Sequence, residues 1–147
     1  MFNNIGDEGL KYIADSPYLS NLTSLKAIRT YIGDKGIMAL SQSKNLSKLR
    51  FLSVMGNSIG NEGVKSLIDA CGVNFPHIHT LHLGRNYITD EGAKYFLQND
   101  YIFKNLLELN LSYTKIHEME KIIPEKLVNL MVFYFGMNEM ITRTKNK

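Results

Sequence analysis

The sequence has one cysteine among 147 residues, little net charge and no long apolar run. A single cysteine excludes a framework of internal disulfides and favours a cytoplasmic or other reducing compartment. The net charge of +3, from 17 basic and 14 acidic residues, is too small to indicate binding to nucleic acid or a membrane surface. No apolar stretch reaches the ~18 residues of a membrane-spanning helix, and no signal peptide pattern opens the chain. We therefore expect neither nucleic acid nor membrane among its partners.

Leucine, isoleucine and asparagine are in excess and together account for 46 of the 147 residues. In length and in its 44% hydrophobic content the chain otherwise matches one ordinary globular domain with a sizeable core. This bias is unusual for a domain built around a single core. Internal repeats are therefore the first feature to look for.

Short strings of the form Ile-Gly-Asp-Glu-Gly recur along the chain, starting at Ile5, Ile32, Ile59 and Ile88. Their starts lie 27, 27 and 29 residues apart. A second pattern, L-x-x-L-x-L-x-x-N-x-I, has five copies that begin at Leu22, Leu49, Ile78, Leu106 and Leu127. We therefore predict a single repeat domain over 1–147, with a half repeat at 3–21 and repeats starting near 22, 49, 78, 106 and 127.

Each repeat predicts a strand, a loop and a helix. The alternation L-x-L places two leucines on one face of a short strand. The asparagine that follows, Asn57 or Asn86, can bond backbone groups of neighbouring repeats, and Thr30 and Thr114 can replace it less completely. After the loop, a polar residue stands where a helix N-cap is expected. These predicted N-caps are Asp7, Asp34, Asn61 and Asp90.

The helical segments carry apolar residues at positions x, x+3 and x+4, which is typical of a helix buried on one side. One aligned column reads Leu10, Ile37, Val64 and Ala93. Because a crossover through a helix to a parallel strand is nearly always right-handed, successive units are expected to stack into a solenoid. We predict an α/β right-handed solenoid with parallel strands on the concave face and helices on the convex face.

These repeats resemble those of leucine-rich repeat proteins, and specifically the ribonuclease-inhibitor-like subclass with repeats of 27–29 residues that carry a full helix. The likeness runs from Asn3 to about Met137. It implies a non-enzymatic scaffold that binds another protein through its concave face.

The two ends depart from the pattern. The chain starts inside a repeat, which indicates a fragment or short form of a longer repeat protein, a half-repeat helix acting as a cap, or an end that pairs with another chain. At the other end, Phe135 stands at the predicted ladder position of the last repeat, within an aromatic stretch at 131–135. Those aromatic residues are expected to cap the last repeat or to form an association surface. The tail at 141–147 is expected to fray.

Catalytic patterns are weak. Cys71 ends a helical segment, which favours a buried structural thiol over a nucleophile. His77, His79 and His82 invite a metal interpretation, but strand alternation separates His79 from His82 and no carboxylate is near them in the motif. We therefore predict no cofactor, no metal site and no enzymatic activity.

The pattern does predict a binding surface, formed by the strand residues that point away from the core. Ile28, Phe51 and Met55 are expected to form one apolar patch, bracketed by Arg29 and Arg85. Arginine and aromatic residues are enriched where binding energy concentrates. The full set of candidate partner-binding residues is Lys26, Ile28, Arg29, Phe51, Met55, His82, Arg85 and Tyr113.

The resemblance leaves several functions open. The first is a protein-binding module whose partner is another, unidentified protein. The alternatives are the substrate-recognition part of a ubiquitin ligase, a bacterial effector delivered into a host cell, and a GTPase-activating protein that would use Arg29 or Arg85. Self-association through the ends is also open.

Overall fold

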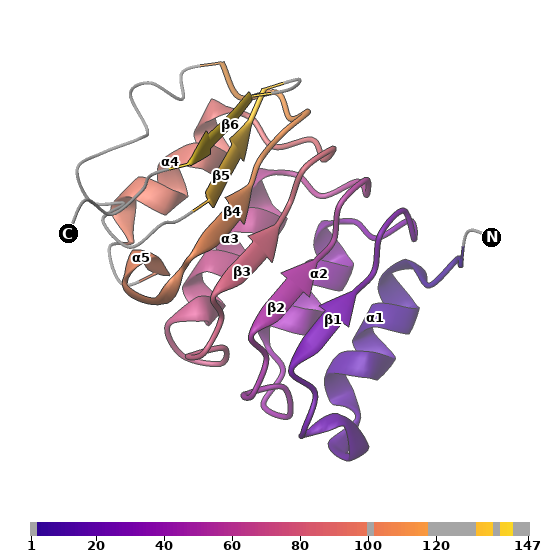
Figure 1. Cartoon of the computed structure of the whole chain (residues 1–147). Helices are drawn as coiled ribbons and strands as arrows, with labels where there is room; N and C mark the ends of the chain where they lie inside the picture. The colour runs from indigo at the N-terminus through magenta and orange to yellow at the C-terminus, as the bar shows by residue number, and fades with distance from the viewer. Residues whose placement is uncertain (1–2, 100–101, 118–131, 137–138, 143–147) are drawn as a thin grey trace.

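The computed structural model describes residues 3–99, 102–117, 132–136 and 139–142, in which helices and short strands alternate (Figure 1). The helices are α1 (Gly6–Asp15), α2 (Asp34–Ser41), α3 (Asn61–Cys71), α4 (Asp90–Gln98) and α5 (Ile102–Asn105), and a 3-10 turn, η1, spans Pro17–Leu19. The strands are β1 (Ser24–Lys26), β2 (Phe51–Ser53), β3 (Thr80–His82), β4 (Glu108–Asn110), β5 (Val132–Phe135) and β6 (Glu139–Thr142).

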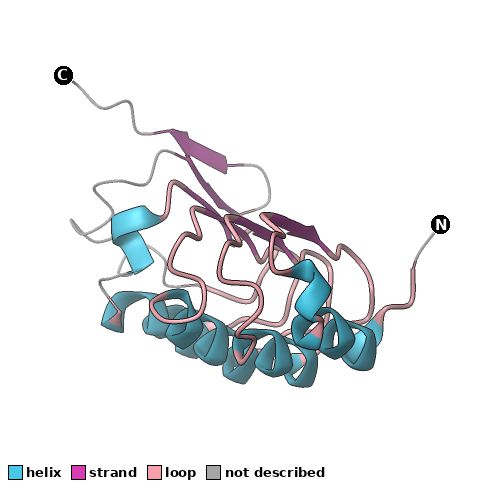
Figure 2. Cartoon of the chain, turned by 90° about the horizontal axis from the view of Figure 1, so that it is seen from below, coloured by secondary structure: helices cyan, strands magenta, loops and turns pink. Residues whose placement is uncertain are grey.

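The strands form one sheet in chain order, from β1 to β6, and β1 to β5 run parallel. Leu25 pairs with Leu52, Leu52 with Leu81 and Leu81 with Leu109, which confirms the predicted leucine column. The larger helices lie side by side along one face of the sheet (Figure 2). The predicted α/β repeat solenoid is therefore confirmed. The concave face is the sheet face turned away from these helices.

Aliphatic side chains fill the space between the sheet and the helices. Leu52 and Leu81 from the strands and Ile37 and Val64 from the helices are fully buried. At the amino-terminal side, Leu10 of α1 is fully buried as well, so this helix covers the apolar side of α2's repeat. The predicted helical stripe is thus the stripe that faces the sheet.

The last parallel strand lies three residues later than the sequence predicts. A repeat starting at 127 would place Leu130 beside Leu109, but the register pairs Phe133 with Leu109. The same offset moves Phe135 from the predicted asparagine column to the column of Leu111, where it packs partly buried against the core. The prediction was wrong because an aromatic V-F-Y-F run can alternate in either register, and burial of Phe135 selects this one. Leu127 and Leu130 themselves lie outside the described residues.

Strand β6 pairs antiparallel with β5 and occupies its outer edge. This pairing satisfies the backbone groups on the outer side of β5 and makes β6 the edge strand of the sheet. Part of the tail that we expected to fray, Ile141–Thr142, therefore belongs to the sheet. The parallel part of the sheet thus ends at β5, and whether this end is a cap or an association surface stays a prediction.

The predicted asparagine ladder is confirmed. The Asn57 Oδ1 atom accepts hydrogen bonds from the backbone N–H groups of Thr30 (2.9 Å) and Ile32 (3.1 Å), one repeat earlier. Its Nδ2 group donates to the Ala27 carbonyl at 2.7 Å. Asn86 forms the equivalent contacts one repeat later. The Thr30 hydroxyl donates to the Ala27 carbonyl of its own repeat, so threonine replaces the amide only in part.

The sequence predicts that the aspartates of the Ile-Gly-Asp-Glu-Gly strings cap their own helices, and this prediction is wrong. The N-cap of α2 is Gly33, and Asp34 is already the first helical residue. The Asp34 carboxylate instead reaches the next repeat, where Oδ1 accepts hydrogen bonds from the N–H groups of Gly60 (2.6 Å) and Gly63 (3.1 Å). The starts of α2, α3 and α4 thus each receive a side-chain hydrogen bond from the preceding repeat. The same cross-repeat bond joins Asp7 to Gly33, Asn61 to Thr89 and Asp90 to His117.

The closing glycine of the second, third and fourth strings makes room for this carboxylate or amide. A Cβ atom at Gly63 would lie 2.5 Å from Asp34 Oδ1, well inside van der Waals contact. Equivalent approaches of 2.6 Å and 2.5 Å occur at Gly36, against Asp7, and at Gly92, against Asn61. The strings of neighbouring repeats therefore form a two-part contact, in which a side-chain oxygen of one repeat lies against the glycine of the next.

Cys71 ends α3 in the core, where its side chain is 5% exposed. Burial raises the pKa of this thiol from its ordinary value of 9.0 to about 12, because the apolar surroundings disfavour the thiolate. The thiol is therefore protonated at neutral pH, which disfavours a nucleophilic role. This agrees with the structural role predicted for it.

We expect Asp34→Ala and Gly63→Ala to be coupled. Asp34→Ala should lower the free energy of unfolding by about 1–3 kcal/mol, because two backbone N–H groups lose a charged acceptor. Gly63→Ala alone should lower it by about 1–3 kcal/mol through overpacking, and by less when Asp34 is already alanine. Urea unfolding of the four proteins of this double-mutant cycle measures the coupling. Strictly additive effects would contradict the two-part contact.

We also expect the stabilising contribution of Cys71 to fall as the pH rises. Above pH 9 the thiol ionises in the unfolded chain but stays protonated in the folded chain up to a pKa of about 12, so high pH favours unfolding. Between pH 8 and pH 10, the unfolding free energy of the parent protein should fall by about 1.4 kcal/mol relative to that of Cys71→Ala. A difference that does not change with pH would show that burial does not perturb the thiol.

Candidate functional site

The predicted site residues fall into two groups, one on the strands themselves and one in the loops that follow them. One group lies on the concave face and contains Lys26, Phe51 and His82 from neighbouring strands. The other lies in the loops that follow the carboxyl ends of the strands, along one edge of the sheet (Figure 1). This edge is called the rim below, and it carries Arg29, Arg85 and Tyr113.

The concave group is a row of side-chain contacts across β1, β2 and β3. The Lys26 ammonium lies 5.1 Å from the centre of the Phe51 ring, within the range of a cation–π interaction. The Phe51 ring in turn meets the His82 imidazole edge-on, with centroids 5.2 Å apart. Lys26 is exposed, whereas Phe51 and His82 are half-buried. This row, Lys26–Phe51–His82, is called the concave cluster.

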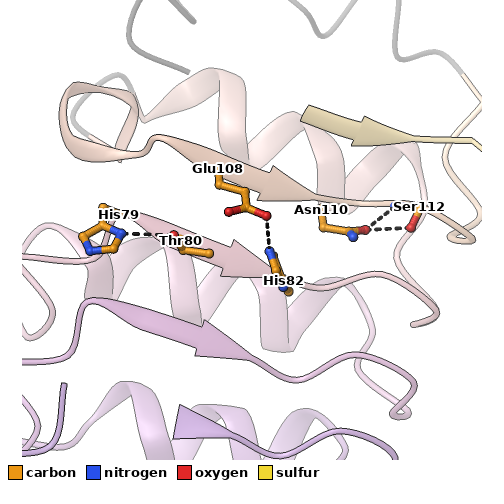
Figure 3. Close-up of polar contacts among 6 residues, drawn as sticks. All are labelled: His79, Thr80, His82, Glu108, Asn110 and Ser112. Carbon is orange, nitrogen blue, oxygen red and sulfur yellow. Dashed lines mark hydrogen bonds and ion pairs between the residues drawn. The ribbon is translucent and has the colours of Figure 1, made fainter. Parts of the chain in front are cut away.

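His82 has a carboxylate partner that the sequence analysis did not foresee. Its Nε2 atom lies 2.7 Å from Glu108 Oε1 on the adjacent strand (Figure 3). The Tyr134 ring approaches the imidazole on the same side of the sheet, with centroids 6.5 Å apart. His79 points elsewhere, and its Nδ1 atom is 3.0 Å from the Thr80 hydroxyl (Figure 3). The parallel register explains the pair, because it places Glu108 beside Thr80, two residues before His82.

The single apolar patch expected from Ile28, Phe51 and Met55 is divided in the structure. Ile28 and Met55 follow β1 and β2 in the same register, and both retain exposed surface. Phe51 lies four residues before Met55, with the buried Ser53 between them on the same face. Phe51 therefore belongs to the concave cluster, and Ile28 and Met55 lie next to the rim.

The rim contains a pocket of about 570 Å³. It is lined by Arg29, Tyr31, Gly56, Asn57, Ser58, Arg85, Asn86, Tyr87, Tyr113 and Lys115. Parallel pairing continues through these loops: the Arg29 N–H donates to the Met55 carbonyl and the Arg85 N–H to the Ser112 carbonyl. The loops are thus stacked as regularly as the strands. This pocket is called the rim pocket.

Two repeat columns build the rim pocket. One column reads Arg29, Gly56, Arg85 and Tyr113, and the other reads Tyr31, Ser58, Tyr87 and Lys115. In both columns the second repeat contributes a very small residue between two large ones. The pocket is the space that these small residues leave open.

Cationic and aromatic side chains are stacked on one another at the rim. The Arg85 guanidinium lies 4.3 Å from the centre of the Tyr113 ring, and the Lys115 ammonium lies 5.0 Å from that of Tyr87. Such stacking holds flexible cationic side chains in place without neutralising them. Among the described lining residues there are three cationic side chains and no carboxylate. The rim pocket is therefore positively charged.

Sequence reasoning identified the two arginines and Tyr113 but missed Lys115 and Glu108. Lys115 was recognisable, because it occupies the same repeat position as Tyr31 and Tyr87. Glu108 was harder to identify, because its pairing with His82 depends on the strand register. The small residues that open the pocket were visible in the sequence as gaps in two columns of large side chains.

Within the described residues, no group of three or more histidine, cysteine, aspartate or glutamate side chains could hold a metal ion. No helix in the described part of the chain is both long and apolar enough to cross a membrane.

Comparisons with known proteins agree with the fold. A sequence profile of the leucine-rich repeat family matches residues 1–14, 45–67 and 76–97. Among solved structures, the chain is similar to the actin-binding site 2 of leiomodin-1, with 17% identity and a TM-score of 0.62 over 90% of this chain and 78% of that one.

The chain is also similar to an internalin from Listeria monocytogenes, with 22% identity and a TM-score of 0.50 over 88% of this chain. It spans only 38% of that internalin structure. No curated protein matches the sequence. The ribonuclease-inhibitor-like subclass stays a prediction from repeat length. The matched profile, the repeats and the stacked parallel strands together show that the chain carries leucine-rich repeats and adopts the leucine-rich repeat fold.

Proposed function

We propose that this chain is a protein-binding module that holds a partner against its concave face and the adjoining rim. The observation that carries the proposal is the concave cluster, in which an exposed lysine is stacked on an aromatic ring. Aromatic and cationic residues of this kind concentrate binding energy in protein interfaces. The strands that carry them are held in register by backbone and asparagine bonds, so the surface is formed before a partner arrives.

Binding fits the concave cluster better than catalysis does. Ser53, His82 and Glu108 lie on neighbouring strands and could suggest a nucleophile, a base and an acid. However, the Ser53 hydroxyl is buried and has no hydrogen-bond partner among the described residues, and it is not within bonding distance of the imidazole. A nucleophile needs a hydrogen bond to its base and access to a substrate. The buried, protonated Cys71 does not provide one either.

The solved structures add support at the level of the fold. The leiomodin-1 structure bears the description of an actin-binding site, so the same architecture occurs in a segment that binds a protein. Because the sequence identity is low, the partner of that structure is not assigned to this chain. The proposal therefore concerns the surface used and leaves the partner's identity to experiment.

The proposal is tested with the double variant Lys26→Ala, Phe51→Ala. We expect at least a tenfold loss of affinity for a captured partner, because alanine removes the stacked pair at the centre of the contact. Lys11→Ala, Tyr12→Ala is the matched control, since it removes a lysine and an exposed aromatic ring from α1 on the helical face. Affinity is measured by biolayer interferometry against the partner recovered by affinity capture and mass spectrometry.

Binding at the concave face would be contradicted if both double variants lost affinity equally, or if only the helical control lost affinity. Urea unfolding of each variant separates loss of contact from loss of fold.

A further inference from the structure

The rim pocket combines three features that the concave cluster does not share. It is a hollow of about 570 Å³, it is cationic, and its large side chains stand on strained backbone. Arg29 and Arg85 flank it from the first and third repeats, and Gly56 and Ser58 of the second repeat form its floor. Because neighbouring strands lie roughly 4.8 Å apart, the two arginine backbones are roughly 10 Å apart along the rim.

The cations of the rim pocket have no ion-pair partner among the residues that the structure describes. Within the described part of the chain, the ion pairs present join His82 to Glu108 and Glu91 to Lys94, and neither involves the pocket. Two of the pocket's cations are instead held by aromatic rings, Arg85 against Tyr113 and Lys115 against Tyr87. Three cations gathered around one hollow repel one another unless an anion joins them. The arrangement is therefore complementary to a negatively charged ligand.

Backbone strain points to the same residues. Arg29, Arg85 and Tyr113 have φ angles of 53°, 56° and 55°, in the left-handed region that L-residues with a Cβ atom disfavour. The equivalent residue of the second repeat is Gly56, with φ 68°, which adopts this conformation without strain. The turn itself thus needs only a glycine. Large side chains are kept at a strained turn when they do something that glycine cannot.

We propose that the rim pocket binds an acidic segment of a partner protein, with two or more glutamate or aspartate side chains paired to Arg29, Arg85 and Lys115. Guanidinium groups match carboxylates with paired hydrogen bonds. The two arginines are separated by two strand spacings, a span that an extended segment with alternating acidic residues can cover with one carboxylate for each guanidinium. The exposed lining also suits a peptide better than a small molecule, which would be mostly enclosed in its pocket.

The acidic segment rests on the proposed function, since it assigns a chemistry to part of the partner's contact. Its test uses a peptide alone and variants of the rim alone. Failure here would leave binding through Phe51 intact, and failure at the concave cluster would leave the rim result intact.

The test is fluorescence anisotropy with a labelled peptide of alternating glutamate and serine, compared with the same peptide carrying glutamine. We expect saturable binding of the glutamate peptide that weakens as salt rises, and no binding of the glutamine peptide. Arg29→Gly and Arg85→Gly should each reduce affinity about tenfold while leaving thermal stability unchanged or higher, because glycine relieves the left-handed strain. Arg50→Ala, which removes an equal charge away from the pocket, should leave affinity unchanged.

Amide chemical shifts locate the bound peptide. With the glutamate peptide added, the signals of Gly56, Ser58 and Tyr87 should move, and those of α1 should stay. Three results would overturn the proposal: equal binding of the glutamine peptide, equal loss of affinity in Arg50→Ala, or binding only when phosphoserine replaces glutamate. The last would assign the pocket to phosphate groups instead of carboxylates.

Discussion

The contact between the acid of one Ile-Gly-Asp-Glu-Gly string and the glycine of the next sets the geometry on which the rest of the molecule depends. Asp34 Oδ1 bonds the backbone of Gly60 and Gly63, and the missing Cβ of Gly63 is what lets the oxygen approach. The contact fixes how far one helix start lies from the next. On the sheet side, the Asn57 amide fixes the same spacing between loops. A slip by one residue would break both sets of bonds together.

Because the repeats are held in register on both sides, residues far apart in sequence meet in columns. Arg29 and Arg85 are 56 residues apart in the chain, yet each occupies the same turn of its repeat, with the same left-handed backbone. A pocket can then be made or closed by changing the size of one residue in a column. Gly56 and Ser58 are the residues that open it here. The functional surface is in this sense a consequence of the stacking contacts.

Much of the fold could be predicted because its main contacts are local in the repeat and recur with it. The leucine columns, the asparagine ladder and the helical stripe all follow from spacing alone. The N-cap prediction for Asp34 was wrong because an aspartate at a helix start bonds its own helix in most proteins, and only the stacked structure shows that the next repeat lies closer. The predicted register of Phe135 was wrong because an aromatic run without leucines at the consensus positions does not show which residues face the core. Packing of the side chains decides it.

The site was less predictable than the fold, for the same physical reason. Side-chain partners across strands depend on where each repeat's register falls, so the contact of His82 with Glu108 and the separation of Phe51 from Met55 could not be derived from one repeat. Lys115 was recoverable from column alignment, since it aligns with Tyr87. Column positions in the sequence thus predict which residues reach the rim, but not which of them touch.

The middle of the concave face places a further limit on how a partner can bind. Ser53, Thr80 and Asn110 point to that face, yet they are only 1%, 6% and 9% exposed. A partner therefore gains little by contacting the centre of β2, β3 and β4. The exposed side chains lie instead at Lys26 on the β1 side and along the rim, where Ile28 is 48% and Tyr87 is 56% exposed. A bound segment that touches both groups must cross the β1 end of the sheet and run along the rim, which is the direction in which the two arginines are spaced.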